Sequence, residues 1–444
     1  MKVQEKISLP ESASNFWVNF LGIVVFFTAL VIGRRYFPQM GVVSLALGCL
    51  LLTVVPLWLY DFVIIKVYQR PSTGLVRPGR LDLVRYVRKL IGLYGTFLII
   101  LILYQFNPVY HHSLSATEFY QTFFEFLNVL APWIMGASFV YFWQMDRWQK
   151  DPYDGYWHMG CLLTGHFKEV KGIILTEHAK TWFIKAFFLP FMFAVLIAYM
   201  NELFLFQWGR DARSFLPVFN YLLSALYAVD IIYGVLGYIL TVRLLDTQIQ
   251  STEPTWIGWL VCLACYYPFS TMWGIGLFKY EDDFHWEHWF AFYPVSYYVC
   301  GITIIVLTLI IALATVAIGY RMSNLTYRGL ITSGPYRWSK HPAYVSKVAS
   351  WWLISLPFFS VESPQAAIYH TFNLSMISLI YYLRARTEEN HLSNYPEYVQ
   401  YANWINDHGI LRLIGRIFPA LRYSEEKCKQ WKSVVWFKQL GSRK

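Results

Sequence analysis

Two stretches near the C-terminal end of the chain carry the residue types that chemistry needs. The first, Gly329–Lys347, contains two prolines, a histidine and several aromatic and basic side chains. Gly334 permits a positive φ and Pro335 presets its own φ, so a tight turn is predicted here. Pro342 suits the first position of a helix, whose free amide groups would form an anion site. Aromatic side chains around the turn predict a wall for a flat base or a cationic methyl donor; they are Tyr336, Trp338 and Tyr344.

The second stretch, residues 381–404, places two arginines and two carboxylates within two helical turns. Arg384 and Glu388 are four residues apart and share one helix face. Arg386 and Glu389 are three residues apart and share another. Taken alone, this cluster has two interpretations. It is a salt-bridged helix end at a membrane interface, or it holds a zwitterion, with arginine binding a carboxylate and glutamate binding an ammonium group.

The composition predicts a membrane protein. Hydrophobic residues make up 56% of the chain and charged residues 14%, whereas a soluble domain carries roughly 25% charged residues. Long apolar runs without strand-like alternation predict an all-α, polytopic helical protein. We expect about ten transmembrane helices, at residues 17–33, 41–65, 90–106, 124–143, 183–200, 215–242, 255–278, 296–320, 347–361 and 365–383.

The formal net charge of +10 is concentrated in three segments: residues 66–89, residues 321–347 and the tail from residue 412 onwards. With ten spans, all three lie on the same side of the membrane, while the loop 280–294 on the other side is acidic. The positive-inside rule then places both termini and the turn in the cytoplasm. Anionic membrane lipids explain these basic segments better than nucleic acid does.

Two regions are predicted. Residues 1–290 hold seven spans and two long cytoplasmic loops, 66–89 and 144–182, of which the second is expected to contain short interfacial helices or a re-entrant segment. Residues 296–444 hold three spans, the turn, which is expected to be a cofactor loop, and a charged, aromatic tail that is expected to form interfacial helices. This second region contains the chemical signals.

The two stretches resemble a known family. LITSGPYRWSKHPAYVSK, residues 330–347, resembles the L-x-T-x-G-P-Y-x-x-x-R-H-P-x-Y-x-G signature of isoprenylcysteine carboxyl methyltransferases, whose relatives include phospholipid methyltransferases. RARTEENHLSNYPEYVQY, residues 384–401, resembles the R-x-R-x-E-E-x-x-L … Y-x-x-Y block of that family. The resemblance covers roughly residues 297–410. It implies that the two blocks close over S-adenosylmethionine at the cytoplasmic membrane face, and that a lipidic or prenylated acceptor enters between the helices.

Site residues follow from the resemblance, position by position. Arg384 or Arg386 would meet a carboxylate of the cofactor or of the acceptor. A carboxylate acceptor needs no general base, whereas a hydroxyl or an amine would need one, and His341 or Glu388 is the candidate. This chain departs from the signature at Lys340, which replaces an arginine, and at Ser346, which replaces a glycine. The implied cofactor-binding residues are Gly334, Pro335, Tyr336, His341, Pro342, Tyr344, Glu388, Glu389, Tyr398 and Tyr401.

Two other functions are compatible with the sequence. Sterol-type, NADPH-dependent ene reductases also have about ten spans, but their C-terminal block carries an H-R-x-x-R-D run where this chain has R-A-R-T-E-E. A transporter or scaffold with a degenerate methyltransferase region is the non-enzymatic alternative.

An acidic loop and one intramembrane aspartate lie outside the two chemical stretches. The acidic loop Asp282–His288 has histidines one turn apart but no partner motif, so no metal site is predicted. Asp230, in the middle of a span, is a functional-site candidate because an intramembrane carboxylate is costly, or else it is protonated or bonded to a neighbouring helix.

Overall fold

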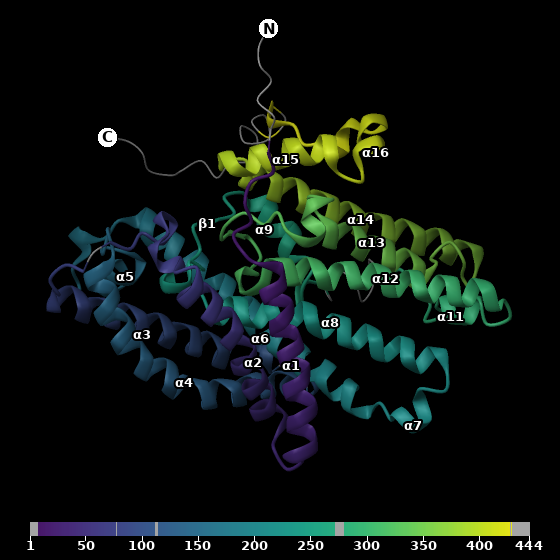
Figure 1. Ribbon diagram of the computed structural model, residues 1–444, viewed down its shortest axis with the longest axis horizontal. Helices are drawn as coiled ribbons and strands as arrows, with labels where there is room; N and C mark the ends of the chain where they lie inside the picture. The colour runs from purple at the N-terminus through teal and green to yellow at the C-terminus, as the bar shows by residue number, and fades with distance from the viewer. Residues whose placement is uncertain (1–7, 77, 112–113, 271–278, 427, 429–444) are drawn as a thin grey trace, which may run out of the picture.

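The computed structural model describes residues 8–76, 78–111, 114–270, 279–426 and 428. Its regular structure is helical apart from one antiparallel pair of two-residue strands, β1 (Ser251–Thr252) and β2 (Thr326–Tyr327). Figure 1 shows the long helices α3, α4, α8, α12, α13 and α14 running in similar directions, with α1 crossing them and α15 and α16 on one edge. The α-helices are α1 (Phe16–Tyr36), α2 (Val42–Trp58), α3 (Leu83–Phe106), α4 (Leu114–Trp148), α5 (Gly155–Leu163), α6 (Gly172–Leu205), α7 (Trp208–Asp211), α8 (Phe215–Ile239), α9 (Trp256–Leu263), α11 (Trp286–Trp289), α12 (Pro294–Ile318), α13 (Pro342–Ser355), α14 (Pro364–Leu392), α15 (Pro396–His408) and α16 (Arg412–Ile417).

Shorter helical turns connect these helices. A π-helical turn, η1 (Leu59–Ile64), extends α2. The 3-10 turns are η2 (Val67–Gln69), η3 (Pro71–Thr73), η4 (Pro108–Tyr110), η5 (Phe167–Glu169), η6 (Arg243–Leu245), η7 (Gly319–Arg321), η8 (Gly334–Arg337) and η9 (Pro419–Leu421).

Seven helical segments in the described part of the chain are long and apolar enough to cross a membrane. They confirm the predicted all-α, membrane-type fold and correspond to seven of the ten expected spans. They are Phe16–Tyr36, Val42–Ile64, Leu83–Phe106, Thr117–Trp148, Gly172–Leu205, Phe215–Ile239 and Pro294–Arg321.

The other three expected spans differ in length or polarity. α9 occupies the start of the segment 255–278, whose last eight residues, 271–278, lie outside the described residues. α13 has 14 residues, or about 21 Å at 1.5 Å per residue, which is shorter than a hydrocarbon core of about 30 Å. α14 has 29 residues but buries polar side chains such as His370 and Asn373. The expected count of ten spans is therefore not confirmed.

The two long loops are partly helical, as residues 144–182 were expected to be. α5 is the short helix in that segment. α3 begins at Leu83, before the predicted start at residue 90, so basic side chains of the loop 66–89 lie within a helix. They are paired with acids: Arg85 Nε lies 2.5 Å from Asp146 Oδ1, and the buried Lys89 Nζ lies 3.4 Å from Asp154 Oδ2. Arg77 of the same loop lies outside the described residues.

Two arginines that were counted in the basic segment 321–347 are buried instead. Arg321 Nη2 lies 3.3 Å from Asp246 Oδ2. Arg328 donates hydrogen bonds to the backbone oxygens of Thr247 (2.7 Å) and Gly237 (2.8 Å). Neither cation therefore faces lipid. Both attach the segment between α12 and the turn to the N-terminal region.

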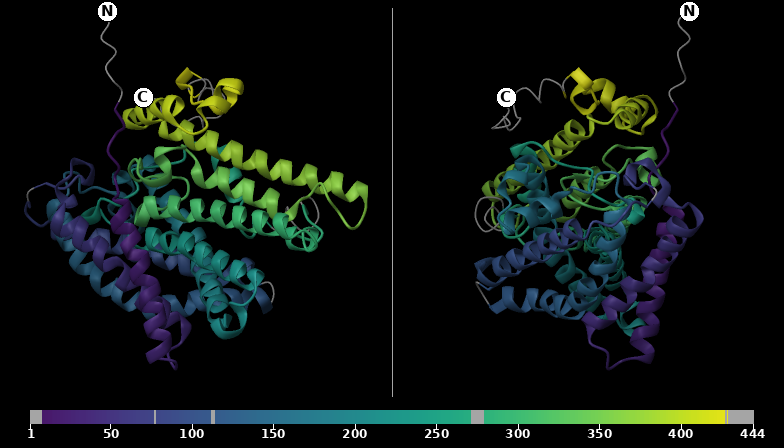
Figure 2. Two further views of the ribbon diagram at one scale, coloured as in Figure 1. Left: turned by 45° about the vertical axis from the view of Figure 1, so that its right-hand side comes forward. Right: turned by 90° about the vertical axis from the view of Figure 1, so that its left-hand side faces the viewer.

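The segment before α1 also contacts the turn. The Ala13 amide donates to Leu330 O (2.7 Å), and Thr332 Oγ1 donates to Pro10 O (2.8 Å). Phe16, at the start of α1, packs where a Cβ on Gly334 would lie, at 2.9 Å. The two predicted regions, 1–290 and 296–444, are thus packed against each other, and Figure 2 shows this first segment rising beside the C-terminal helices.

Asp230 and His285, in a span and in the acidic loop respectively, both lie near charged or polar partners. Asp230 accepts a hydrogen bond from Thr315 on α12 and lies 3.9 Å from Lys347 Nζ on α13, so it is bonded to neighbouring helices. In the acidic loop, His285 Nε2 lies 3.4 Å from Glu281 Oε2. Within the described residues, no group of three or more His, Cys, Asp or Glu side chains could hold a metal ion.

Gly237 gives a test of the packing between α8 and the turn that follows α12. A Cβ at this position would lie 2.0 Å from Met322 O, whereas a Cβ on Gly48 in α2 would meet nothing within 4 Å. We expect Gly237→Ala to lower the free energy of unfolding by about 1–3 kcal/mol through overpacking. Gly48→Ala is the control and should leave it unchanged or raise it slightly. Thermal unfolding of both variants in the same detergent measures the difference, and equal melting temperatures would contradict this packing.

Candidate active site

The two chemical stretches meet in space, as the sequence predicts. His341 Nε2 lies 3.3 Å from Glu389 Oε1, and Tyr344 Oη donates a hydrogen bond to Glu388 Oε2 at 2.8 Å. The Tyr401 hydroxyl on α15 donates to the backbone oxygen of Tyr336 at 2.8 Å. The turn before α13 and the C-terminal end of α14 therefore form one site.

Local sequence positions the turn. Gly334 has a φ of +58°, which favours glycine, and η8 begins there with Pro335 in its first turn. His341 is the residue before α13, and Pro342 begins that helix, as predicted. This arrangement points His341 towards α14.

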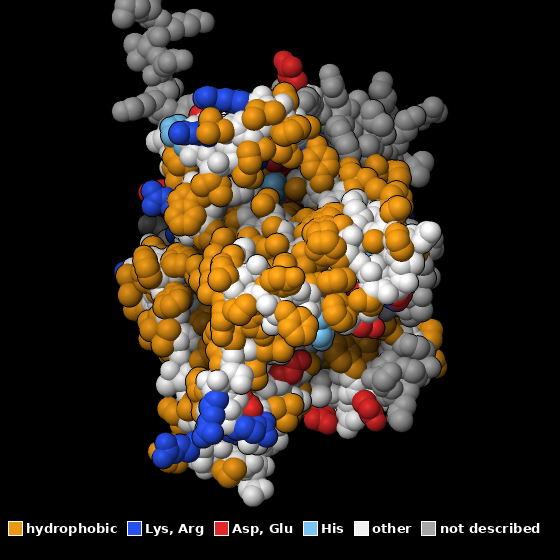
Figure 3. Space-filling view, turned by 90° about the vertical axis from the view of Figure 1, so that its right-hand side faces the viewer, with side chains coloured by type: hydrophobic (Ala, Val, Ile, Leu, Met, Phe, Trp, Pro, Cys, Tyr) orange, Lys and Arg blue, Asp and Glu red, His pale blue; other side chains and the backbone are white. Residues whose placement is uncertain are grey.

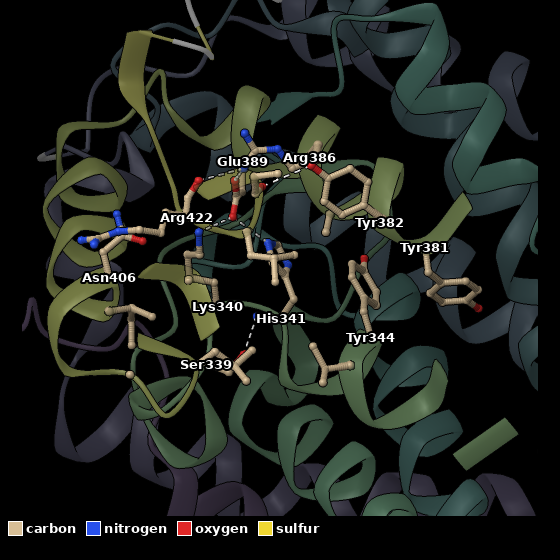
Figure 4. Close-up of a pocket in the computed structure, with 18 of the residues that line it drawn as sticks. Ser339, Lys340, His341, Tyr344, Tyr381, Tyr382, Arg386, Glu389, Asn406 and Arg422 are labelled. Carbon is tan, nitrogen blue, oxygen red and sulfur yellow. Dashed lines mark hydrogen bonds and ion pairs between the residues drawn. The ribbon is translucent and has the colours of Figure 1, made fainter. Parts of the chain in front are cut away.

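A cavity of about 370 Å³ lies between α13, α14 and the segment that follows α15. Figure 4 shows its polar end around Glu389, with Arg422 and Asn406 on one side and Tyr344, Tyr381 and Tyr382 further along. Most of the remaining lining is apolar. The lining residues include Trp338, Lys340, His341, Tyr344, Val345, Val348, Ala349, Tyr381, Tyr382, Arg386, Glu389, Asn406, Leu411, Arg412, Gly415, Ala420, Leu421 and Arg422.

Glu389 is the centre of the polar end. Its side chain is 2% exposed and pairs with Arg386 Nη1 at 2.5 Å and Lys340 Nζ at 2.6 Å, in addition to His341. Burial by itself raises the pKa of the Glu389 carboxyl. The hydrogen bond from His341 and the charges of Lys340 and Arg386 outweigh burial and bring this pKa to about 2. The carboxylate is thus ionised and its charge is compensated by the protein itself.

Lys340 shows what the departure from the family signature does. A lysine cannot make the bidentate contact of an arginine, yet Lys340 reaches Glu389 through a single short contact. Burial lowers the pKa of its ammonium group, and the charge of Glu389 opposes that shift. Ser346, the other departure, is buried in α13.

Arg384 and Glu388 share a helix face but are not paired with each other. Arg384 Nη2 donates to Asn324 Oδ1 (2.5 Å), and its guanidinium carbon lies 5.1 Å from the ring centre of Tyr344. Its guanidinium also lies near the rings of Tyr266 and Tyr381. Neither Arg384 nor Glu388 lines the cavity.

The other predicted cofactor residues lie behind the cavity wall. Gly334 and Pro335 pack against α1 and α12, and Pro342 is buried at the start of α13. Burial raises the pKa of the Tyr336 hydroxyl, and the charge of Glu388 adds to this shift. Tyr398 and Tyr401 are buried in the cluster that packs α15. The Tyr398 hydroxyl has no hydrogen-bond partner among the described residues. Of the predicted set, His341, Tyr344, Arg386 and Glu389 line the cavity.

Several cavity residues were not expected from the sequence. Asn406, Arg412 and Arg422 lie after the second block, where no motif marked them. Asn406 and Tyr423 exchange two hydrogen bonds, Nδ2 to Tyr423 O at 2.9 Å and Tyr423 N to Oδ1 at 3.0 Å. Arg386 Nη1 also donates to Arg422 O at 3.4 Å. In the sequence, these arginines stand out only because they recur within an apolar run. The sequence predicted that they belong to a basic tail. Lys427 and Lys429–Lys444 of that tail lie outside the described residues.

Glu389→Gln tests the polar end. The substitution leaves Lys340 and Arg386 without a counter-charge, and breaking a buried pair in this way costs about 3–5 kcal/mol of stability. The pKa of Glu389 is about 2 in the folded protein against an ordinary value of 4.5, so its contribution is complete above pH 4.5 and is lost as the pH falls towards 2. We expect the melting temperature of the wild type to fall more steeply over that pH range than that of Glu389→Gln.

Melting curves in detergent at several pH values measure both effects. Glu426→Gln, at an exposed position, is the control and should behave as the wild type does. Parallel pH profiles for wild type and Glu389→Gln would contradict the pairing.

Comparison with known proteins identifies the region that holds the site. No curated protein and no solved structure matches the chain. One family model matches it, over residues 297–394, which include the turn, α13 and the Arg384–Glu389 cluster but not Tyr398 or Tyr401. With seven apolar helices long enough to span a bilayer, the chain is an integral membrane protein, and its residues 297–394 match the isoprenylcysteine carboxyl methyltransferase (ICMT) family.

Proposed function

We propose that the protein transfers a methyl group from S-adenosylmethionine to a carboxylate of a lipidic or prenylated acceptor at the cytoplasmic membrane face. The family match supports methyl transfer. We choose this acceptor because of the shape and charge of the cavity. One end is polar and cationic, and it continues into an apolar extension between α13 and α14. An amphiphile with a negative head group fits such a cavity.

The residues present fit the cofactor. Small-molecule sites have volumes of roughly 300–1000 Å³, and the 370 Å³ cavity lies in that range. Trp338 and Tyr344 offer aromatic faces to an adenine ring or a sulfonium cation.

Glu388 is the candidate for the ammonium group of the methionine moiety, although its side chain is not part of the cavity lining and contacts the lining residue Tyr344. Glu389 is already paired with Lys340, His341 and Arg386. Glu388 is half-buried and accepts one hydrogen bond, from Tyr344, among those found in the described residues. We therefore assign Glu388 to the cofactor and Glu389 to the placement of Lys340, His341 and Arg386. We also assign Gly334, Pro335 and Tyr336 to the shape of the turn.

Charge favours a carboxylate acceptor over an amine. Lys340, Arg386, Arg412 and Arg422 line the polar end, where Glu389 is the one acid among the lining residues. The excess of positive charge attracts a carboxylate and repels an ammonium group. S-adenosylmethionine supplies a methyl group on a sulfonium: one C–O bond forms as the C–S bond breaks, and no proton moves.

The chain's own residues then act by positioning and by excluding water. Arg386 orients the carboxylate of the acceptor. His341, held by Glu389, needs no role as a base for this acceptor. The apolar extension receives the hydrocarbon chain, and it is formed by Val345, Val348, Ala349, Tyr381 and Tyr382. Such a site accelerates transfer by orientation in a dry environment.

The N-terminal seven-span region has a structural role in this proposal. It holds the turn through Arg328 and through residues 8–16. The cytoplasmic orientation rests on the distribution of basic residues. The ene-reductase and scaffold alternatives lack an observation that favours them over methyl transfer.

A transfer assay tests the proposal. Purified protein in nanodiscs is given S-adenosylmethionine with a labelled methyl group and, separately, a farnesylcysteine analogue or phosphatidylethanolamine. We expect label on the farnesylcysteine analogue only, released as methanol by alkali because a carboxyl methyl ester is hydrolysed whereas a methylamine is not. Label on phosphatidylethanolamine, or binding of S-adenosylhomocysteine too weak to measure in the folded protein, would contradict it.

Arg386→Ala tests the assigned contact. Removing a hydrogen bond to a charged group costs about 1.5–3 kcal/mol, so kcat/KM for the prenylated acceptor should fall about 10- to 100-fold. The control, Arg337→Ala, removes an exposed arginine of η8 outside the cavity lining and should leave kcat/KM unchanged. Equal effects of the two substitutions would refute the role of Arg386.

Ala349→Phe tests the apolar extension. The larger side chain should raise KM for the prenylated acceptor and leave the Kd of S-adenosylhomocysteine unchanged, because it fills the part of the cavity away from Glu389. Ile368→Phe, on an exposed face of α14, is the control. Calorimetric titration and initial rates separate the two constants, and a loss of cofactor binding alone would place the hydrocarbon chain elsewhere.

A further inference from the structure

The segment that follows α15 forms the roof of the cavity. We define the roof segment as residues 409–422, which include α16 and η9. Its inner side contributes Leu411, Gly415, Ala420 and Leu421 to the cavity lining. The Tyr382 hydroxyl on α14 donates to Ala420 O at 3.2 Å.

The roof segment is also fixed to the turn before α13. The Ile410 amide donates a hydrogen bond to Trp338 O at 2.9 Å. Two chain segments that line the cavity, the turn and α14, thus hold the roof segment in place. It lies beyond the family match, which ends at residue 394.

The outer side of the roof segment is apolar and exposed. The exposed fractions are 69% for Ile410, 59% for Leu413, 72% for Ile417 and 59% for Phe418. Trp338, bonded to Ile410, is 59% exposed beside them. Isolated apolar residues are common on protein surfaces, but a contiguous group of this kind marks a docking surface.

Arginines accompany this apolar surface. Arg412 and Arg416 are exposed within α16, and long arginine side chains can place their carbon stems on apolar surface while the guanidinium reaches a polar layer. In Figure 3, Lys and Arg side chains lie above hydrophobic ones at the top of the face, where α15 and α16 are located. A histidine side chain is visible in a hollow below them.

The neighbouring surface identifies the occupant. Val345 on α13 and Leu379 on α14, close to the cavity-lining residues of those helices, are also exposed apolar residues. In a chain with seven helices long enough to span a bilayer, exposed apolar side chains of this kind are expected to face lipid. The roof segment continues this surface and adds cations, which is the composition of an interfacial helix on an anionic leaflet.

We infer that the roof segment lies in the head-group layer of an anionic leaflet, with Leu413, Ile417 and Phe418 towards the acyl chains and Arg416 among the lipid phosphates. The cavity is then closed on one side by a segment that the membrane itself holds. This inference does not rest on methyl transfer, because it concerns only the outer side of the roof segment.

Depth-dependent quenching tests the inference. Ile417→Cys, labelled with bimane, is reconstituted as the full chain in nanodiscs of phosphatidylcholine or of phosphatidylcholine with phosphatidylglycerol, with and without brominated acyl chains. Asn403→Cys on α15, which is also exposed, is the matched control. Phe418→Cys repeats the measurement in case the first variant misfolds. The unsubstituted chain corrects for labelling of its six cysteines.

We expect brominated chains to quench bimane at residues 417 and 418 at least twofold more than at residue 403. Quenching at residue 417 should also increase with phosphatidylglycerol, and Arg416→Glu should remove that increase. Equal quenching at residues 417 and 403 would overturn the membrane contact, and quenching independent of phosphatidylglycerol would overturn the role of the arginines. Neither readout depends on enzymatic activity, so the inference and the proposed function can fail separately.

Discussion

The site depends on one buried carboxylate. Glu389 is almost completely enclosed and contacts Lys340 and His341 from the turn and Arg386 from its own helix. A buried charge is stable only when it is paired, so the position of the turn relative to α14 is set by this electrostatic requirement. The same contacts leave the cavity with an excess of positive charge, because one acid is shared among several cations. The pairing of Glu389 therefore accounts both for the position of the turn and for the proposed preference for a carboxylate acceptor.

The rest of the chain holds the turn before α13 and the end of α14 in place. α13 is short and α14 is polar for a membrane helix, so neither is expected to be fixed by the bilayer alone. Arg328 and Arg321 attach the segment after α12 to the backbone and to Asp246 of the N-terminal region. Moving this segment away would break the hydrogen bonds from the buried arginines to backbone oxygens. Each guanidinium would then stay buried without a partner, which is costly, so the segment is held in place. The first seven spans thus contribute to the site without lining it.

The sequence predicted the features that arise from local rules. The positive φ of Gly334, the helix start at Pro342 and the i,i+3 pair of Arg386 and Glu389 follow from residue type and spacing. Hydropathy located the seven long apolar helices correctly. It did not predict that α14 would bury polar side chains, because their partners come from other parts of the fold. Spacing put Arg384 beside Glu388, yet Asn324 and three tyrosine rings surround its guanidinium. Arg412 and Arg422 could not be assigned, since their role depends on the fold of α15 and α16 over α14.

The hydrogen bonds between residues 10–13 and residues 330–332 have a practical consequence for handling the protein. Pro10 and Ala13 share hydrogen bonds with Thr332 and Leu330, a few residues before the wall that holds His341. Affinity tags, fluorescent fusions or protease sites placed directly against this stretch compete with those backbone bonds. Attaching them through a long flexible spacer ahead of residue 8 leaves the contact intact, and trimming the chain to the start of α1 would remove it.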